Sequence, residues 1–299
     1  QGAITLPAKK FSDIIRELPA GEVILYVRKN NQVEIEGVNC KFKLNGLPKE
    51  EFPKFPEFKD KDAVLIQQKD LKEMIRLTSF AVSFEESRYV LNGILLEMSA
   101  DKARMVATDG RRLAKIEKKL VQNSHKDISI IIPIKAISEI NRNLKETGEC
   151  SIICSANQVL FNIDGILIAT RIIEGEFPNY KQVIPKEATT KAKIKTQELL
   201  AAIKRANLLS TPDFQAIKFE LFKDKMVISK STPDVGESRE EMVVEYGQQE
   251  LMVGFNPQFF IDVLKNIEDD HIDLEFLGSD KPCVLRLRDY LYLALPMRL

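Results

Sequence analysis

The chain repeats one pattern of apolar and polar positions five times. In each copy, a short run rich in β-branched residues is followed by a polar residue or a proline, and then by an amphipathic helical pattern. The five predicted strand–helix segments are residues 3–18, 63–77, 130–144, 192–208 and 251–267. They recur at intervals of about 60 to 65 residues, so the pattern predicts a structural repeat that extends over the whole chain.

Helices and strand pairs alternate within this repeat. In residues 11–18 and 260–267, apolar side chains fall at i, i+3, i+4 and i+7, which places them on one helix face. Between the helices, strand-like stretches come in pairs across polar turn residues. The predicted pairs are 23–27 with 32–36, 94–98 with 104–107, and 217–221 with 225–228. Because strands outnumber helices, the predicted class is α+β with antiparallel sheets.

A longer repeat is visible in the connecting segments. Glu51-Phe52-Pro53 and Glu176-Phe177-Pro178 are alike, and the chain ends in another proline-containing segment at a similar interval. Two of the shorter repeats therefore make one domain, which predicts domains at residues 1–58, 59–186 and 187–299. The first of these is about one repeat shorter than the others, so we expect a further half-domain upstream of it.

Composition narrows the class of protein. Lys and Arg together number 44, as do Asp and Glu, so the formal net charge is zero and the chain does not bind nucleic acid by bulk charge. No apolar run approaches the roughly 18 residues of a membrane span. Four cysteines in 299 residues do not form a disulfide framework. We therefore expect a cytoplasmic protein that does not contact membranes.

Cations nevertheless gather on the polar faces of four predicted helices. If like units closed into a ring, which would leave no sheet edge exposed, these helices would line a hole and hold a polyanion without reading its bases. Acidic residues such as Asp70 and Glu139 on the same helices favour an ordinary solvated surface instead, and the pattern leaves both interpretations open. The cations are Lys9, Lys10, Arg16, Lys69, Lys72, Arg76, Lys135, Arg142, Lys145, Lys204 and Arg205.

Four motifs carry a resemblance to a known family. They are Arg88-Tyr-Val-Leu-Asn-Gly93, Val106-Ala-Thr-Asp-Gly-Arg-Arg-Leu-Ala114, Glu176-Phe-Pro-Asn-Tyr180 and Leu295-Pro-Met-Arg-Leu299. With them, the chain resembles the bacterial DNA polymerase III beta subunit, the beta sliding clamp, without the first half of its N-terminal domain. The resemblance implies repeated clamp-type domains, with sheets outside and helices lining the inner face of a ring. It also implies a head-to-tail homodimer around duplex DNA, which acts as a processivity factor for the replicative polymerase and is not an enzyme.

The resemblance further implies a peptide-binding pocket between the second and third domains. DNA polymerase III, other polymerases, the clamp loader and repair proteins would dock there on an apolar floor, with Arg88, Arg112 and Asn256 holding polar parts of the peptide. Arg111, Gln182 and Phe259 depart from the residues usual in the family, which bears on the choice of partner. The matching positions are Arg88, Leu91, Thr108, Gly110, Arg112, Leu113, Pro178, Val183, Phe214, Asn256, Phe259, Leu293, Leu295, Pro296, Met297, Arg298 and Leu299.

Two further surfaces follow from the same resemblance. The positions that match DNA contacts are Lys9, Arg16, Tyr89, Lys135 and Arg142, and Val90 stands where a second aromatic residue is common. The subunit interface would join Lys41, Phe42 and Leu44 of the first domain to Leu208, Leu209, Glu237, Glu240 and Glu241 of the third.

Other chemistry has weaker support in the sequence. Cys150 and Cys154 lack the second pair and the histidine of a zinc site, so we expect neither metal nor cofactor. His125 and His271 accompany no nucleophile motif, and no phosphate-binding or dinucleotide fingerprint is present. The alternative function is a repeat-built scaffold that binds peptides and never encircles DNA. Retention on circular compared with linear duplex distinguishes the two.

Overall fold

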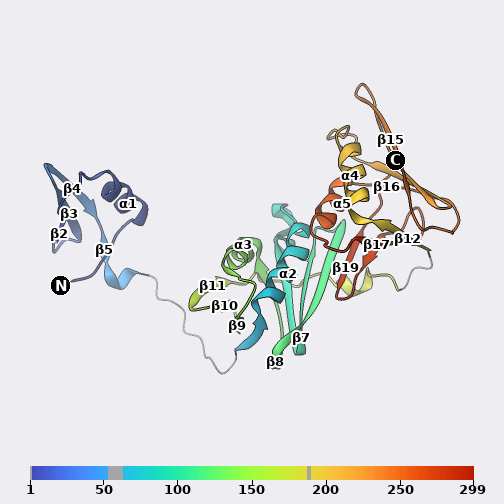
Figure 1. Ribbon diagram of the computed structural model, residues 1–299. Helices are drawn as coiled ribbons and strands as arrows, with labels where there is room; N and C mark the ends of the chain where they lie inside the picture. The colour runs from blue at the N-terminus through green and yellow to red at the C-terminus, as the bar shows by residue number, and fades with distance from the viewer. Residues whose placement is uncertain (1, 53–62, 187–189) are drawn as a thin grey trace. The chain divides into compact units, whose positions relative to one another are not determined.

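The computed structural model describes residues 2–52, 63–186 and 190–299, apart from the side chains of Asn123 and His125 (Figure 1). The chain divides into two compact units, Gln1–Glu57 and Phe58–Leu299, and each is described by itself. Pro53 of the first connector and the segments that hold the predicted domain boundaries, 53–62 and 187–189, lie outside the described residues. Among the described residues, no helix has the length and apolar character that crossing a bilayer requires.

The first unit is a small antiparallel sheet with one helix. Its sheet has the order β2-β3-β4, and the short strands β1 and β5 pair with each other. Val33 and Ile35 are buried on the middle strand, but the helix buries no residue and every residue of β2 is exposed. The elements are β1 (Ile4–Thr5), α1 (Ala8–Glu17), β2 (Ile24–Val27), β3 (Gln32–Gly37), β4 (Cys40–Asn45), β5 (Leu47–Pro48) and the 3₁₀ turn η1 (Lys49–Glu51).

The second unit begins with a strand, a helix and a long β-hairpin. The elements of its first half are β6 (Val64–Gln67), α2 (Gln68–Thr78), the 3₁₀ turns η3 (Ser79–Ala81) and η4 (Glu86–Asn92), β7 (Gly93–Thr108), β8 (Arg112–Pro133), α3 (Ile134–Asn143), β9 (Glu149–Cys154), β10 (Gln158–Ile163), β11 (Ile166–Arg171) and η5 (Tyr180–Gln182). Its second half follows the same plan with β12 (Thr190–Lys195), α4 (Thr196–Asn207), β13 (Ile217–Phe222), β14 (Lys225–Thr232), β15 (Gly236–Val243), β16 (Leu251–Phe255), α5 (Pro257–Leu264), β17 (His271–Phe276), β18 (Cys283–Arg286) and β19 (Tyr290–Ala294).

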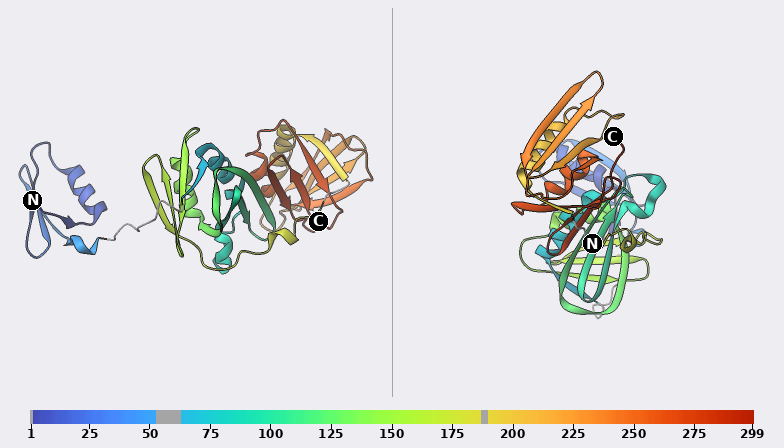
Figure 2. Two further views of the ribbon diagram at one scale, coloured as in Figure 1. Left: turned by 90° about the horizontal axis from the view of Figure 1, so that it is seen from below. Right: turned by 90° about the vertical axis from the view of Figure 1, so that its right-hand side faces the viewer.

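One sheet connects the two halves of the second unit. Its order is β12-β17-β18-β19-β8-β7, so the C-terminal strand β19 pairs with β8 of the first half. Two four-stranded sheets, β11-β10-β9-β6 and β15-β14-β13-β16, complete the unit. Helix α2 contacts strands of the first two sheets, and α4 contacts strands of the central and last sheets and packs on α5 (Figures 1 and 2). The helices therefore bury their apolar faces between sheets.

The opposite face of the central sheet carries a second, smaller core. Leu95, Leu113 and Leu293 are buried there, whereas the neighbouring Ile94 and Leu96 belong to the main core on the helix side. This alternation follows from the period of two along a strand. Phe177 and its neighbours in the segment that follows β11 pack over the second core.

All five predicted strand–helix segments are present, and two of the three predicted hairpins are confirmed. The turns between β2 and β3 and between β13 and β14 place Asn31 and Asp224 at positive φ angles of 61° and 57°. These are residue types that adopt this conformation readily. The hairpin predicted between 94–98 and 104–107 is wrong. Strand β7 continues through Ser99–Lys102, and the polar residues mark register shifts against β8 rather than a turn.

Candidate partner-binding pocket

The tight turn between β7 and β8 is built from its own side chains. The Asp109 carboxylate accepts hydrogen bonds from the backbone N–H groups of Arg111 and Arg112 at 2.9 and 3.0 Å. The Thr108 hydroxyl accepts from the N–H of Gly110 at 3.0 Å and donates to the carbonyl of Arg112 at 2.6 Å. Gly110 has a φ of +88°, and a Cβ there would lie 2.8 Å from the Arg88 guanidinium. The turn therefore requires the residue types that the motif at 106–114 supplies.

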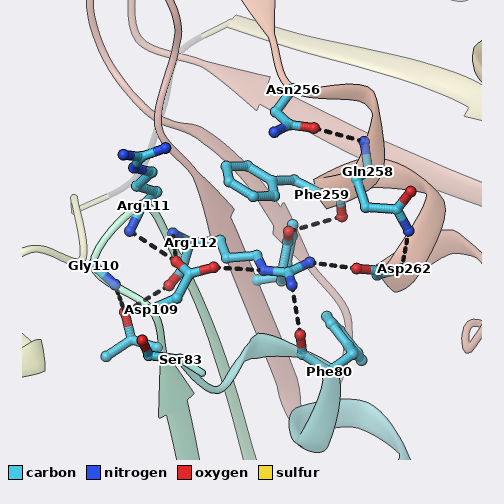
Figure 3. Close-up of polar contacts among 12 residues, drawn as sticks. Phe80, Ser83, Asp109, Gly110, Arg111, Arg112, Asn256, Gln258, Phe259 and Asp262 are labelled. Carbon is cyan, nitrogen blue, oxygen red and sulfur yellow. Dashed lines mark hydrogen bonds and ion pairs between the residues drawn. The ribbon is translucent and has the colours of Figure 1, made fainter. Parts of the chain in front are cut away.

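Arg112 extends from this turn into the second half of the unit (Figure 3). Its guanidinium binds the carboxylate of Asp109 at 3.0 Å, the carboxylate of Asp262 at 2.7 Å and the carbonyl of Phe80 at 2.6 Å. It also lies over the Phe259 ring, 4.9 Å from the ring centre. Because Asp262 and Phe259 are on α5, Arg112 joins the hairpin to this helix, and its guanidinium nitrogens are already engaged.

A hollow of about 160 Å³ lies beside this turn, on the sheet face that carries the second core. Leu113 and Leu293 form a buried floor, whereas Val183 is 55% exposed and Leu295 is 39% exposed at the rim. An apolar floor with a half-open rim suits one or two apolar side chains of a partner. The residues that line it are Leu91, Thr108, Gly110, Arg111, Arg112, Leu113, Pro178, Asn179, Tyr180, Val183, Leu293 and Leu295.

A second hollow, of about 610 Å³, contains Phe214 and the C-terminal residues Met297, Arg298 and Leu299. The Met297 N–H donates to the carbonyl of Gly254 at 2.8 Å, which fixes the C-terminal segment beside β16. Lys230 is buried below and donates to the carbonyls of Phe214 and Ala216 at 2.6 and 2.8 Å. Burial lowers the pKa of Lys230.

The structure thus divides the predicted peptide-binding residues between two hollows and their surroundings. Arg88 donates from its guanidinium to the carbonyl of Asp109 at 3.0 Å. Asn256 caps α5 by accepting from the N–H of Gln258 at 2.9 Å, and its amide donates to Gln215 at 3.3 Å. Pro296 lies between Leu295 and Met297, which line the first and the second hollow respectively.

Tyr180 is a lining residue that the sequence analysis missed. It stands at the end of the motif Glu176–Tyr180, so the signal was present but no role was assigned to it. Its hydroxyl donates to the Glu97 carboxylate at 2.7 Å and accepts from Arg104 at 3.3 Å. Burial raises the pKa of Tyr180 to about 12, and the hydrogen bond to Glu97 adds to this effect.

The residues predicted to contact DNA are on the surface. Lys9 and Arg16 are exposed on α1 of the first unit, and Lys135 and Arg142 are exposed on α3 of the second. Tyr89 is 58% exposed in η4. These positions are accessible to a polyanion.

Arg142 and several other cations of the same helices have partners within the chain. Arg142 binds the Glu139 carboxylate on its own helix at 2.7 Å. Lys72 binds Glu146 at 2.6 Å, and Arg205 binds Glu240 on β15. Arg76 donates to the carbonyl of Asn266. These helix faces therefore carry mixed charge, as an ordinary solvated surface does. Exposed ion pairs are weak, so a phosphate can displace the acidic partner.

The residues predicted for a subunit interface lie at sheet edges or beside them. Lys41, Phe42 and Leu44 are on β4, the edge strand of the first unit's sheet, and Glu237, Glu240 and Glu241 are on the edge strand β15. Leu208 and Leu209 follow α4, and Leu208 is 81% exposed. An edge strand presents unpaired backbone groups to which another strand can be added.

No metal chemistry is found in the part of the chain that the structure describes. It contains no group of three or more His, Cys, Asp or Glu side chains with the arrangement of a metal site. Cys150 and Cys154 are unpaired, and burial raises the pKa of Cys150 to about 12 and that of Cys154 to about 11. These thiols stay protonated near neutral pH, which disfavours both metal binding and nucleophilic chemistry.

Comparison with known proteins identifies the family of this chain. The family models of the N-terminal, central and C-terminal domains of the DNA polymerase III beta subunit match residues 1–56, 65–179 and 181–298. The beta sliding clamp of Chlamydia pneumoniae is 32% identical over 300 residues, which cover 100% of this chain and 82% of the relative. That of Staphylococcus epidermidis is 33% identical over 293 residues, or 96% of this chain and 77% of the relative.

The fold agrees with these sequence matches. The crystal structure of the DNA polymerase sliding clamp from Bacillus subtilis superimposes with a TM-score of 0.90 at 30% identity, and the match covers 100% of this chain and 80% of that one. The fold is that of the DNA clamps, as the resemblance implied. The chain belongs to the family of the bacterial DNA polymerase III beta subunit.

Proposed function

We propose that this chain is a sliding clamp, a processivity factor that surrounds duplex DNA and holds the replicative polymerase on its template. The observation that carries the proposal is the match to three successive domains of one family, in order, from residue 1 to residue 298. Relatives with the name beta sliding clamp match over 96 to 100% of the chain. The alternative, a peptide-binding scaffold without a DNA function, is not favoured by these relatives.

In this proposal, DNA is held by charge and not by sequence. The exposed Lys9, Arg16, Lys135 and Arg142 meet phosphates, and Tyr89 contacts the duplex from η4. Lys9, Arg16 and Lys135 make no ion pair with the described residues, whereas Arg142 has to exchange Glu139 for a phosphate. Only a few phosphates are therefore neutralised at once. The dependence on salt is therefore shallow, and the clamp slides.

The two hollows near the β7–β8 turn and the C-terminus together form the docking site for partner peptides. Polymerase III, the clamp loader and repair proteins insert apolar side chains above Leu113 and Leu293 in the smaller hollow and beside Met297 in the larger one. Arg112 acts indirectly, because it fixes the wall of the smaller hollow to α5. Methionine at the entrance repacks for different partners.

The domain plan of 1–58, 59–186 and 187–299 leads to a head-to-tail dimer. Strand β4 of one subunit lies along β15 of the next, and Phe42 and Leu44 meet Leu208 and Leu209. Such a heterologous contact closes a ring when two copies form it twice. Pairing of the two edges also explains why neither strand is protected within its own sheet.

Topology provides the decisive experiment. The protein is loaded onto a nicked circular plasmid by the clamp loader from the same genome, and the DNA-bound fraction is isolated by gel filtration. Part of the sample is then cut once with a restriction enzyme. A clamp stays on the circle and is lost from the linear form, because only topological linkage depends on DNA ends. Equal retention on both forms contradicts encirclement and favours the scaffold.

A further inference from the structure

A larger hollow adjoins the smaller partner-binding hollow. It lies between the segment 172–181 and one face of the β7–β8 pair, has a volume of about 570 Å³, and is called the linker trench here. Pro178, Asn179 and Tyr180 line both hollows and form the wall between them. A chain that leaves the smaller hollow across this wall therefore enters the trench.

The trench combines an apolar floor with an acidic rim. Leu95 and Ile131 are buried at its base, and Ile173 packs against the same core. Glu174 and Glu176 are exposed at the rim, and neither makes an ion pair with any side chain of the described ranges. This surface suits a side chain with an apolar stem and a positive end.

The other charged residues that line the trench, Glu97 and Lys181, form no ion pair with Glu174 or Glu176. The Glu97 carboxylate is held by Arg104 at 3.0 Å and by the Tyr180 hydroxyl at 2.7 Å. Lys181 also borders the neighbouring hollow around residues 98–104, and its ammonium lies 5.9 Å from the centre of the Tyr180 ring. Glu174 and Glu176 are therefore the unpaired acids of this trench.

The segment that presents these two acids is fixed by the fold. The Ile173 N–H donates to the carbonyl of Ile131 at 2.8 Å. Gly175, between the two acids, has a φ of +132°, and a Cβ there would lie 3.0 Å from Val90. The backbone that carries both acids is thus held in place, so only their side chains lose entropy when a cation binds.

We propose that the linker trench extends the partner-binding pocket and takes a lysine or arginine of the partner chain, with Glu174 and Glu176 as its counter-charges. This inference rests on the proposed docking function of the pocket. The apolar part of the partner supplies most of the affinity in the smaller hollow. The flanking cation speeds association and selects partners with a basic residue beside the apolar ones.

The test measures binding of the DNA polymerase III catalytic subunit from the same genome by surface plasmon resonance. The variants are Glu174→Lys, Glu176→Lys and the double variant, and Glu250→Lys is the matched control. Glu250 is exposed in the second unit and lines neither hollow. Leu295→Asp tests the smaller hollow itself. Circular dichroism checks that each variant folds.

The double variant is expected to bind about five- to tenfold more weakly at low salt, mainly through slower association. The difference from the unchanged protein shrinks as salt screens the pairs, and Glu250→Lys stays near the unchanged value. Unchanged binding of the double variant, with Leu295→Asp still abolishing it, overturns the trench proposal and leaves the pocket standing. Unchanged binding by Leu295→Asp instead contradicts the pocket assignment itself.

Discussion

A single side chain, Arg112, connects the β7–β8 turn beside the smaller hollow to helix α5. The resemblance assigned it to the pocket, and it lines the smaller hollow, but its guanidinium is directed to Asp109, Asp262 and the Phe80 carbonyl. An arginine that is largely buried between two carboxylates has little to offer a peptide directly. Its contribution is to hold the turn against α5, so that Leu113 and Phe259 keep their places.

Replacing Arg112 with Ala is therefore expected to act on stability as well as on binding. The change leaves Asp109 and Asp262 without their cation in a site where the Arg112 side chain is only 10% exposed. Loss of one partner of a buried pair costs about 3 to 5 kcal/mol. Urea unfolding of the second unit measures this cost. Arg298→Ala, at an exposed position, is the control, and an equal effect of both variants would contradict the role given to Arg112.

The ionisation of Tyr180 makes the stability of the folded protein depend on pH in the alkaline range. Its pKa in the folded protein is about 12, above the ordinary value of 10, because burial and the Glu97 carboxylate disfavour the phenolate. The folded state thus holds the phenolic proton more tightly than the unfolded chain does. This contribution is complete below about pH 10 and is lost as the pH rises toward 12.

Comparing Tyr180→Phe with the unchanged protein isolates the contribution of the Tyr180 hydroxyl to stability. The free energy of unfolding is measured in urea between pH 8 and about pH 11.5. The unchanged protein is expected to lose stability more steeply above pH 10 than the variant, since phenylalanine has no proton to lose. Parallel curves for the two proteins would contradict a raised pKa at this position.

The periodic spacing of apolar residues predicted the secondary-structure elements more reliably than the residue types typical of turns did. The strand–helix segments could be located because helices such as α1 and α2 repeat one apolar spacing directly after a strand. The β7–β8 hairpin could not, since Ser99–Lys102 has the composition of a turn but lies within a strand. The pairing of β8 with β19 joins residues far apart in the sequence, and no local pattern contains that information.

Equivalent helices of the repeat share a buried polar residue at the first position. Gln68 begins α2, and its amide contacts the carbonyl of Glu149 at 3.2 Å and the carboxylate of Asp164 at 3.0 Å, while its oxygen accepts from the Lys145 N–H at 2.9 Å. Thr196 begins α4, and its hydroxyl donates to the Asp269 carbonyl at 2.5 Å. Each residue ties its helix to the segment that precedes a distant strand.

Gln68→Leu is expected to destabilise the second unit by about 2 to 4 kcal/mol, because it leaves buried donors and acceptors unpaired. Gln67→Leu, at the exposed neighbouring position, is the control and is expected to change stability by less than about 0.5 kcal/mol. Thermal unfolding followed by circular dichroism compares the two. Similar melting temperatures for both variants would show that the side-chain bonds of Gln68 contribute little.

At the scale of the molecule, the proposed function assigns peptide docking and DNA retention to different residues. Met297 and Leu299 line the larger hollow, whereas the cations proposed to meet DNA are on α1 and α3. Met297→Ala with Leu299→Ala is therefore expected to weaken polymerase binding by at least about tenfold. Less protein is loaded, because the clamp loader is proposed to dock at the same site, but the half-life of the loaded protein on circular DNA stays unchanged. Plasmon resonance and the plasmid assay measure the two properties on one sample. Loss of both together would mean that the surfaces are not separate.

In the proposed dimer, ring closure depends on the edge strands β4 and β15 and on the exposed Leu208 beside them. Leu208→Asp places a charge where an apolar contact with Phe42 and Leu44 of a second copy is proposed. We expect the dimer dissociation constant to rise by about a hundredfold, with loss of retention on circular DNA. Sedimentation velocity over a range of concentrations measures the first effect.

The matched control for this interface is Val121→Asp, which introduces the same charge at an apolar position that is 45% exposed on β8. This position lies outside the proposed contact, so the control is expected to stay dimeric and on the circle. If Leu208→Asp also stayed dimeric, the subunits would have to meet through another surface, because burying an aspartate against Phe42 and Leu44 is costly. Lys41 and Lys43, the lysines on either side of Phe42, are already paired with Glu34 of their own sheet.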